Sequence, residues 1–252
     1  MAYFDHFEIN IISALSAQLL EKLKQLEPAP LHPDYLDALA GGQGIYQLYH
    51  QQNLVYVGKA NSLKKRLNEH RDKISGRQRI DVAEMSFTCL YVHPNWTALA
   101  PEESLIKHYK KSGEGACAWN GNGFGPHDPG RDRETTDKPT EGFDAKYPIR
   151  GDWPCDWIDK GSYDAFELLS SLKRELPFLL RFEMAAKKSR SPHDAFSGLR
   201  VEVLEDGMRS TDLLVLVAKA LPGWQATAFP SHLILYEEDR PYKHGKRLWP
   251  CG

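Results

Sequence analysis

Two short runs of β-favouring residues open the most strongly patterned part of the chain. They span 44–49 and 54–57, and the polar residues between them indicate a turn, so the pattern is typical of an antiparallel hairpin. Gly58 is expected to end the second strand, and Asn61 or Ser62 to cap a helix. The apolar positions that follow keep helical spacing, at Leu63, Leu67 and Ile74. The pattern therefore predicts a strand, a strand and a helix in succession.

A leucine stripe predicts another helix ahead of the hairpin, over 16–26, ending before the proline-rich stretch 28–33. Its members are Leu19, Leu20, Leu23 and Leu26. Such a stripe is more typical of a packing or dimer surface than of a binding groove, so no chemistry is assigned to it. After the hairpin and its helix, a strand is expected at 85–92 and a further helix from Pro101 to about Lys111. The three strands predict a small antiparallel sheet flanked by helices.

Residues 151–252 have a pattern of their own. Helices are expected at 163–174 and 211–221, strands at 199–204, 225–229 and 233–236, and a further apolar stretch at 178–184. The fold class is therefore α+β, in three parts. We expect an N-terminal helical extension at 1–40, a core at 41–150, and a C-terminal α+β appendage without a catalytic motif. The end of the core, 131–150, is charged and rich in proline and glycine, which indicates an excursion or linker.

The charge of the chain is nearly balanced overall but not locally. A formal net charge of −2 argues against indiscriminate binding to polyanions. Between Lys59 and Arg79, however, eight basic residues face two acidic ones, Glu69 and Asp72. Such an excess of positive charge is expected on a surface that binds the phosphates of nucleic acid.

The spacing of the cysteines and the length of the apolar runs indicate in which cellular compartment the protein is expected. The four cysteines are scattered without a C-x-x-C pair, which predicts reduced thiols and neither a zinc site nor a disulfide framework. The chain opens with polar residues unlike a signal peptide, and no apolar run reaches the length of a membrane span. We expect a soluble, cytoplasmic protein with no membrane contact.

Side chains with chemistry gather in the predicted hairpin and helix. Tyr46 and Tyr56 would lie on adjacent strands, and Arg66 and His70 are four residues apart on one helix face. Together with Lys59 they could hold and cut a phosphodiester. The alternative is that the tyrosines only pack and the basic helix is a solvated face, and the spacing alone leaves this open.

Two adjacent carboxylates compete for one role on the helix that Pro101 begins. Glu103 lines up with Lys107, which predicts an ordinary ion pair on the solvent side. Glu102 instead shares the apolar face, with Leu105, Ile106 and Tyr109. A carboxylate that points inward can coordinate Mg²⁺ together with waters and a phosphate, and the helix N-terminus favours its ionised form. Simple capping of the helix by Glu102 remains the alternative.

Five motif elements occur in a fixed order along this part of the chain. They are Gly44-Ile45-Tyr46, Tyr56-Val57-Gly58, Arg66 with His70, Glu102 before an aliphatic pair, and Trp119-Asn120. In this order they resemble the GIY-YIG nuclease superfamily, with Val57 in place of the usual isoleucine. The resemblance covers residues 40 to 125 or so, and the glycine-rich stretch 123–130 is similar to the dimeric type II restriction endonucleases of that superfamily.

The resemblance implies a role for each of these residues. Glu102 would hold a single Mg²⁺, which Mn²⁺ could replace, and Arg66 would stabilise the charge of the transition state. Tyr46 would accept the proton of the attacking water, and this requires Lys59 and Arg66 to lower the tyrosine's pKa. The remaining roles are orientation of the water by Tyr56, relay or orientation of the proton by His70, and support of the active-site region by Asn120.

Basic side chains near the motifs are the candidate DNA contacts. They are Lys64, Lys65, Arg77 and Arg79 in the basic segment, and Arg131 and Arg133 in the excursion, where Lys138 and Arg150 are further candidates. An exposed linker is the alternative reading of the excursion. The expected function is Mg²⁺-dependent, site-specific cleavage of double-stranded DNA by a homodimer, because one single-metal site cuts one strand. A structure-specific or mobile-element nicking nuclease and a non-catalytic DNA-binding module remain as alternatives.

Overall fold

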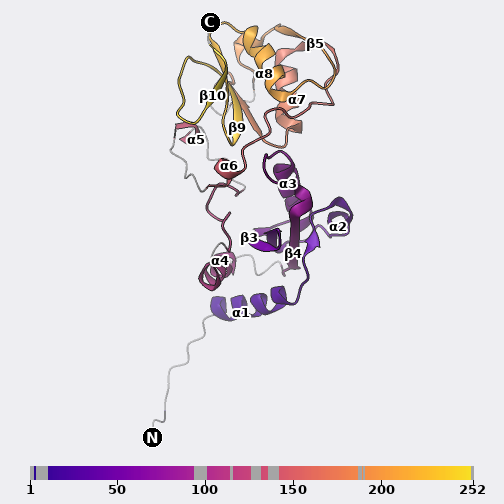
Figure 1. The fold of residues 1–252 in the computed structure, drawn as a ribbon, viewed down its shortest axis with the longest axis vertical. Helices are drawn as coiled ribbons and strands as arrows, with labels where there is room; N and C mark the ends of the chain where they lie inside the picture. Colours follow the sequence, from indigo (N-terminus) through magenta and orange to yellow (C-terminus); the bar gives the residue numbers. More distant parts are fainter. Residues whose placement is uncertain are drawn as a thin grey trace. The chain divides into compact units, whose positions relative to one another are not determined.

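The computed structural model describes residues 3, 11–93, 101–113, 116–125, 132–135, 142–186, 189 and 191–250. The chain divides into two compact units (Figure 1). Unit 1 comprises residues 1–72 and 81–125, and unit 2 comprises residues 73–80 and 126–252. This division differs from the boundaries expected at residues 40 and 150. Within the described residues, no helix combines the length and the apolar character needed to cross a membrane.

A four-stranded antiparallel sheet forms the centre of unit 1, in the order β1-β4-β2-β3. Its strands are β1 (Ala29–Pro30), β2 (Gly44–His50), β3 (Asn53–Ala60) and β4 (Met85–Tyr91). The three expected strands are confirmed, and the two-residue β1 adds a fourth beside β4. The hairpin turn is tighter than expected, because Gln51 and Gln52 both adopt left-handed φ angles, of 48° and 68°, and so form a two-residue loop.

Helices cover both faces of this sheet. They are α1 (Ile11–Lys24), α3 (Leu63–Ser75) and α4 (Pro101–Ser112), with the short α2 (Pro33–Asp37) and η1 (Val82–Glu84) between strands. Ser62 is the N-cap of α3, since its hydroxyl accepts a hydrogen bond from the Lys65 backbone N–H at 3.4 Å. Figure 1 shows α3 on one side of the sheet and α1 and α4 on the other.

Alternation along the strands decides which residues meet which helices. Ile45 and Val57 face α1 and α4, in one buried cluster with Leu15, Leu19, Leu23, Leu105 and Cys117. Tyr46 and Tyr56 lie on the opposite face, toward α3. Leucines of α1 are therefore part of the core of unit 1.

Unit 2 contains a second α+β arrangement. Its elements after residue 150 are β5 (Gly161–Asp164), α7 (Ala165–Glu175), β6 (Leu179–Phe182), η3 (Asp194–Phe196), β7 (Arg200–Val203), α8 (Ser210–Lys219), β8 (Trp224–Ala228), β9 (His232–Glu237) and β10 (Lys246–Trp249). One sheet has the order β10-β8-β9-β6, in which β6 and β9 are parallel, and β5 pairs with β7 separately. The expected C-terminal α+β unit is confirmed, although β5 and β10 were not anticipated.

The core of unit 2 lies between its helices and strands. Among its fully buried members are Leu168, Leu169 and Leu172 from α7, Leu213, Leu214 and Val217 from α8, and Leu180, Ala226 and Leu235 from the sheet. Helix α7 begins two residues later than expected, because the Asp164 carboxylate accepts hydrogen bonds from the backbone N–H groups of Phe166 and Glu167 and so caps it. Tyr163, expected in the helix, lies in β5.

The described part of the excursion is packed rather than extended. It contains α5 (Asp132–Thr135) and α6 (Phe143–Lys146). The side chains of Phe143 and Asp144 are buried, and Asp144 forms an ion pair with Arg77 at 3.0 Å. The Ile149 backbone N–H also donates to the Pro230 carbonyl at 2.9 Å. An exposed linker therefore does not describe residues 142–150, in which Phe143, Asp144 and Ile149 are buried within unit 2.

Candidate active site

The register of the hairpin brings Tyr46 directly opposite Gly58. Strand β3 does not end at this glycine, as we expected, but continues to Ala60. A Cβ atom at Gly58 would overlap the phenol oxygen and Cζ of Tyr46 and would lie 2.8 Å from Cε1 of Tyr56. The glycine is therefore needed because the Tyr46 ring lies across the strand at this point.

The Tyr46 hydroxyl is the meeting point of two helical side chains. Its oxygen lies 2.7 Å from Nε2 of His70, and Nε of Arg66 donates to it at 3.4 Å. Both partners come from α3, one turn apart, as the spacing predicted. Glu69, which the sequence did not point to, accepts a hydrogen bond from Nη1 of Arg66 at 2.7 Å and so holds the guanidinium in place. Because Arg66 can only donate, the phenol hydrogen is available to His70.

An aromatic cluster fixes the other side of His70. The Phe124 ring stacks on the imidazole with centroids 4.7 Å apart, and it also meets the rings of Tyr56 at 5.0 Å and Trp119 at 4.8 Å. Phe124 is fully buried. We did not single it out from the sequence, although a lone aromatic residue within a glycine-rich stretch was the available signal.

Asn120 clamps the middle of β3. Its side-chain oxygen accepts from the Val57 backbone N–H at 2.9 Å, and its side-chain nitrogen donates to the Val57 carbonyl at 2.8 Å. The Trp119 backbone N–H also donates to the Val55 carbonyl at 2.9 Å. The carboxamide thus takes the place of a neighbouring strand at the residue between Tyr56 and Gly58. This is the geometry that the expected supporting role requires.

The two neighbouring glutamates of α4 differ in the way the helix periodicity predicted. Glu102 is partly buried and Glu103 is exposed. Burial raises the pKa of Glu102, while the charge of Lys59 lowers it and that of Glu103 raises it. The negative charge of Glu102 in turn raises the pKa of Tyr56. Glu102, Lys59 and Tyr56 are therefore within electrostatic range of one another, and burial has the largest effect on the pKa of Glu102.

The tyrosines are harder to ionise than we expected. The pKa of Tyr46 is raised above the ordinary tyrosine value, mainly because the side chain is buried and next because of the charge of Tyr56. Arg66 lowers it, but not enough to offset burial. We expected Lys59 and Arg66 to bring this pKa below its ordinary value; Arg66 acts in that direction, but burial outweighs it and the pKa is raised. The phenol of Tyr46 is therefore neutral near physiological pH.

The residues present fit a metal held by one protein carboxylate. Among the described side chains, no three His, Cys, Asp or Glu residues form a cluster that could hold an ion. A partly buried Glu102, whose pKa is raised by desolvation, is suited to Mg²⁺, which keeps several waters and takes substrate phosphate as further ligands. The positive charge of Lys59 favours the ionised form of this carboxylate but does not offset its burial.

The candidate DNA contacts occupy different environments. Lys65 and Arg79 are exposed, and Lys64 forms an ion pair with Asp37 at 3.2 Å. Arg77 is buried, and its Nη1 donates to the Asp144 carboxylate and to the carbonyls of Tyr147 and Pro230. This position excludes Arg77 as a phosphate contact, contrary to our expectation. Arg131 and the side chain of Arg133 lie outside the described residues, as does Lys138.

Comparison with known proteins gives a family match for the residues that carry the candidate site. Residues 43–150 match the family profile of the Eco29kI GIY-YIG domain, which is of the restriction-endonuclease type. The matched residues include all five motif elements, and the C-terminal residues from 151 lie outside them. No match is found among curated proteins. Residues 43–150 therefore form a GIY-YIG domain of the Eco29kI family, a nuclease domain that acts on DNA.

Proposed function

We propose that the protein is a Mg²⁺-dependent, site-specific endonuclease that hydrolyses phosphodiesters in double-stranded DNA, as a homodimer in the cytoplasm. The observation that carries the proposal is the Tyr46 hydroxyl, held 2.7 Å from a histidine nitrogen and 3.4 Å from an arginine nitrogen. A phenol in this position can move a proton and is at the same time close to a cation that can stabilise phosphoryl charge.

The raised pKa of Tyr46 favours a relay over a free phenolate. As water attacks phosphorus and the bond to the leaving oxygen breaks, the phenol takes a proton from the water and passes its own to Nε2 of His70. The phenol then never carries a full negative charge in its buried surroundings. Stacking on Phe124 keeps the imidazole aligned for this transfer.

The remaining residues act on charge and orientation. Arg66, oriented by Glu69, stabilises negative charge that develops on the phosphoryl oxygens. Tyr56, a neutral phenol because burial and Glu102 raise its pKa, orients the attacking water. Glu102 would hold the Mg²⁺, which when bound supplies Lewis-acid stabilisation of the phosphate and of the leaving 3′ oxygen. Lys59 favours the ionised form of this carboxylate.

The argument for a homodimer comes from the two-fold symmetry of a cut through both strands of DNA. A single site of this kind cuts one strand, so a cut through both strands of a palindrome calls for two sites related by a two-fold axis. Leu19 and Leu23 of the leucine stripe are buried within unit 1, so these two side chains are not proposed as part of the dimer surface. The free thiols of Cys89, Cys117 and Cys155 agree with a reducing compartment.

Digestion of a supercoiled plasmid with Mg²⁺, followed by sequencing of the ends, tests the proposal. We expect linear products with ends at one short sequence, and no cleavage when Mg²⁺ is chelated. Glu102→Gln should abolish cleavage and keep or improve DNA binding, because a carboxylate that repels phosphate is removed. Glu103→Gln is the matched control on the exposed side of the same turn and should cut normally.

Each other outcome points to a different conclusion. Accumulation of nicked circles with no linear product would favour the nicking nuclease. Binding without any cleavage across divalent ions would favour the non-catalytic module. If Glu103→Gln abolished cleavage and Glu102→Gln did not, the metal ligand would be the exposed neighbour. Sedimentation with and without a cognate duplex tests the dimer, and a persistent monomer that makes concerted double-strand breaks would contradict it.

A further inference from the structure

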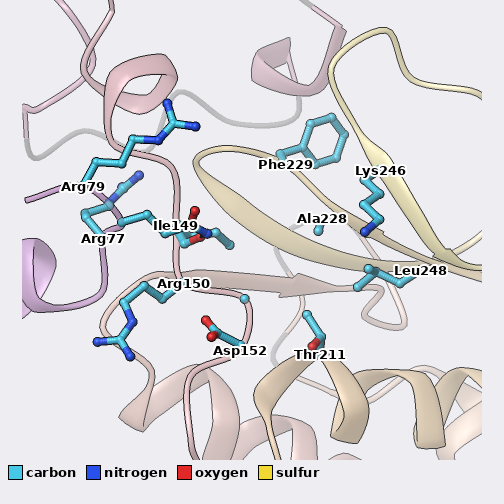
Figure 2. A pocket seen from close by; sticks show the side chains of 12 residues that line it. Arg77, Arg79, Ile149, Arg150, Asp152, Thr211, Ala228, Phe229, Lys246 and Leu248 are labelled. Atoms are coloured by element: carbon cyan, nitrogen blue, oxygen red, sulfur yellow. The ribbon is translucent and has the colours of Figure 1, made fainter.

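A basic pocket lies in unit 2, away from the tyrosines, His70 and Glu102 of the candidate active site. Its volume is about 730 Å³. Figure 2 shows Arg79 and Arg150 on one side of it and Lys246, on β10, on the other. Ala228 and Leu248 supply an apolar wall, and Asp152 is the acidic residue of the lining.

The backbone that carries these side chains is fixed by hydrogen bonds. The Gln78 N–H donates to the Pro148 carbonyl at 2.8 Å, and the Arg150 N–H donates to the Gly76 carbonyl at 2.9 Å. On the other side, Lys246 is paired with Ala228 in the sheet. The three cations are therefore held on ordered backbone, so a ligand would find them already in position.

The positive charge of the pocket is largely uncompensated. Arg77, which also lines the pocket, is balanced by Asp144 and by backbone carbonyls. Arg79 and Lys246, by contrast, are exposed and have no ion-pair partner among the described residues. Arg150 lies with its guanidinium carbon 5.4 Å from the ring centroid of Trp153, a contact that leaves its N–H donors free to bind an anion. Three such cations against one exposed carboxylate favour an anionic ligand.

The backbone of Arg79 adopts a conformation that a local turn does not favour for this residue. Its φ angle is +63°, in the left-handed region, where residues other than glycine, asparagine and aspartate are uncommon. Such a conformation is strained and persists where the surrounding structure imposes it. An arginine therefore occupies a position whose backbone angle would favour glycine, and its side chain lines the pocket.

We infer that this pocket binds a phosphate group of the DNA backbone, through Arg79, Arg150 and Lys246, so that the C-terminal unit is a second DNA-contacting surface. Arginine pairs bidentately with phosphate oxygens, and lysine adds a point charge. The volume far exceeds that of a phosphate ion, and the apolar wall suits the adjoining deoxyribose. The inference rests on the proposed function insofar as the ligand is the DNA that the nuclease domain acts on. Arg79 and Arg150 lie within the family match, whereas Lys246 and the wall formed by residues 211–248 lie outside it, so the pocket combines the matched region with residues beyond it.

The salt dependence of DNA binding by the full chain tests the inference. The pocket variant combines Arg79→Ala, Arg150→Ala and Lys246→Ala. Its control combines Lys160→Ala, Arg174→Ala and Arg209→Ala, which remove the same charge from exposed positions of unit 2 outside the pocket. Binding to a duplex is measured without divalent metal at several salt concentrations, and thermal melting confirms that both variants fold.

The expected result is a smaller salt slope for the pocket variant alone. The slope of log K against log salt should fall by about 0.9 for each phosphate that is no longer neutralised, so by about 1 to 3 in total, and the control should keep the wild-type slope. Equal slopes in the pocket variant and the control would overturn the inference. Cleavage by the wild-type protein is followed in parallel. If the wild-type protein cleaves normally but the pocket variant and the control have equal salt slopes, the pocket inference alone is refuted. If the wild-type protein does not cleave but the pocket variant has the smaller salt slope, the nuclease proposal alone is refuted.

A calorimetric titration separates the two sources of a phosphate. Inorganic phosphate and a mononucleotide are titrated into the wild-type protein and into the pocket variant. A DNA backbone site should bind neither ligand tightly, because one phosphate supplies only part of the interaction. A different result would overturn the DNA assignment: the wild-type protein binds the mononucleotide at micromolar concentrations and the pocket variant does not, while the salt slopes of their DNA binding are equal. The ligand would then be a free nucleotide.

Discussion

Replacement of Tyr46 by phenylalanine removes one oxygen atom from the centre of the candidate site. The ring remains to fill the space beside Gly58, but the 2.7 Å contact with His70 and the 3.4 Å contact with Arg66 are lost. His70 is almost completely buried, so its Nε2 loses a partner that water cannot readily replace. An unsatisfied buried group costs about 1–3 kcal/mol of unfolding free energy, and loss of a proton-transfer group lowers the rate by about 10² to 10⁴.

Tyr49→Phe is the matched control in the same strand. Its hydroxyl donates to Oε1 of Gln47 at 2.9 Å and takes no part in the contacts of His70. The Gln47 oxygen keeps the hydroxyl of Thr88 as a partner, also at 2.9 Å. Tyr49→Phe should therefore cost about 1 kcal/mol and leave the cleavage rate nearly unchanged. Single-turnover cleavage and chemical unfolding of both variants separate chemistry from stability.

The pH dependence of the same two variants tests the relay. Because burial raises the pKa of Tyr46, the phenol stays protonated through neutral pH, and the rate should show no rise that tracks phenolate formation below about pH 10. The folded protein binds this proton more tightly than the unfolded chain, whose tyrosines titrate near pH 10. Stability is therefore unaffected below that pH and falls as the pH rises above it, and Tyr46→Phe should lessen the fall.

Two results would refute this reasoning. A Tyr46→Phe protein with near wild-type turnover would remove the phenol from the mechanism and would leave His70 or a metal-bound hydroxide as the base. Equal rate losses in Tyr46→Phe and Tyr49→Phe would show that the sheet, and not the hydroxyl, had been perturbed. A rate that climbs steeply with pH in the wild type but not in Tyr46→Phe would restore the free phenolate in place of the relay.

The remaining predictions concern how the site is held. Gly58→Ala should reduce plasmid cleavage at least as much as Tyr46→Phe, because the new Cβ displaces the phenol of Tyr46. Gly41→Ala is the control and should cut normally in the same assay, since no atom lies within 4 Å of its Cβ. Asn120→Ala should lower the unfolding free energy by about 1–3 kcal/mol and slow cleavage, since both hydrogen bonds to Val57 are lost; an unchanged denaturation midpoint would exclude the clamp. Arg77→Ala should cost about 3–5 kcal/mol by leaving Asp144 buried without its cation, as measured by denaturant unfolding; a stable variant with weakened DNA binding would return Arg77 to the DNA contacts.

The sequence was sufficient where the site depends on local periodicity. The strand-to-helix order placed Tyr46 and Tyr56 on adjacent strands and Arg66 and His70 on one helix face, and the structure brings Tyr46, Arg66 and His70 into contact. The inward direction of Glu102 followed from helix geometry in the same way. Neither inference needed knowledge of distant segments, since each rests on spacings of two, three or four residues.

The pKa of Tyr46 could not be predicted in this way, because it depends on how much of the unit covers the phenol. The sequence identified the cations near this tyrosine, and Arg66 does lower the pKa. The opposing effect comes from burial, in a cluster where Phe124, more than fifty residues away, packs on Tyr56 and His70, the two rings that meet Tyr46. A count of neighbouring charges gives the wrong sign when desolvation is the larger contribution.

Arg77 and Arg79 show the same limit within one basic segment. Charge and spacing treat the two arginines alike, and from the sequence both are candidate DNA contacts. Arg77 lies inside unit 2 because Asp144 and the Pro230 carbonyl, 67 and 153 residues further along the chain, provide the partners that a buried guanidinium needs. Arg79 has no such partners among the described residues and stays at the surface of the pocket, in a strained backbone conformation. Only the tertiary structure separates an arginine that stabilises the fold from one that is free to meet a phosphate, and the two variants Arg77→Ala and Arg79→Ala should accordingly affect different measurements.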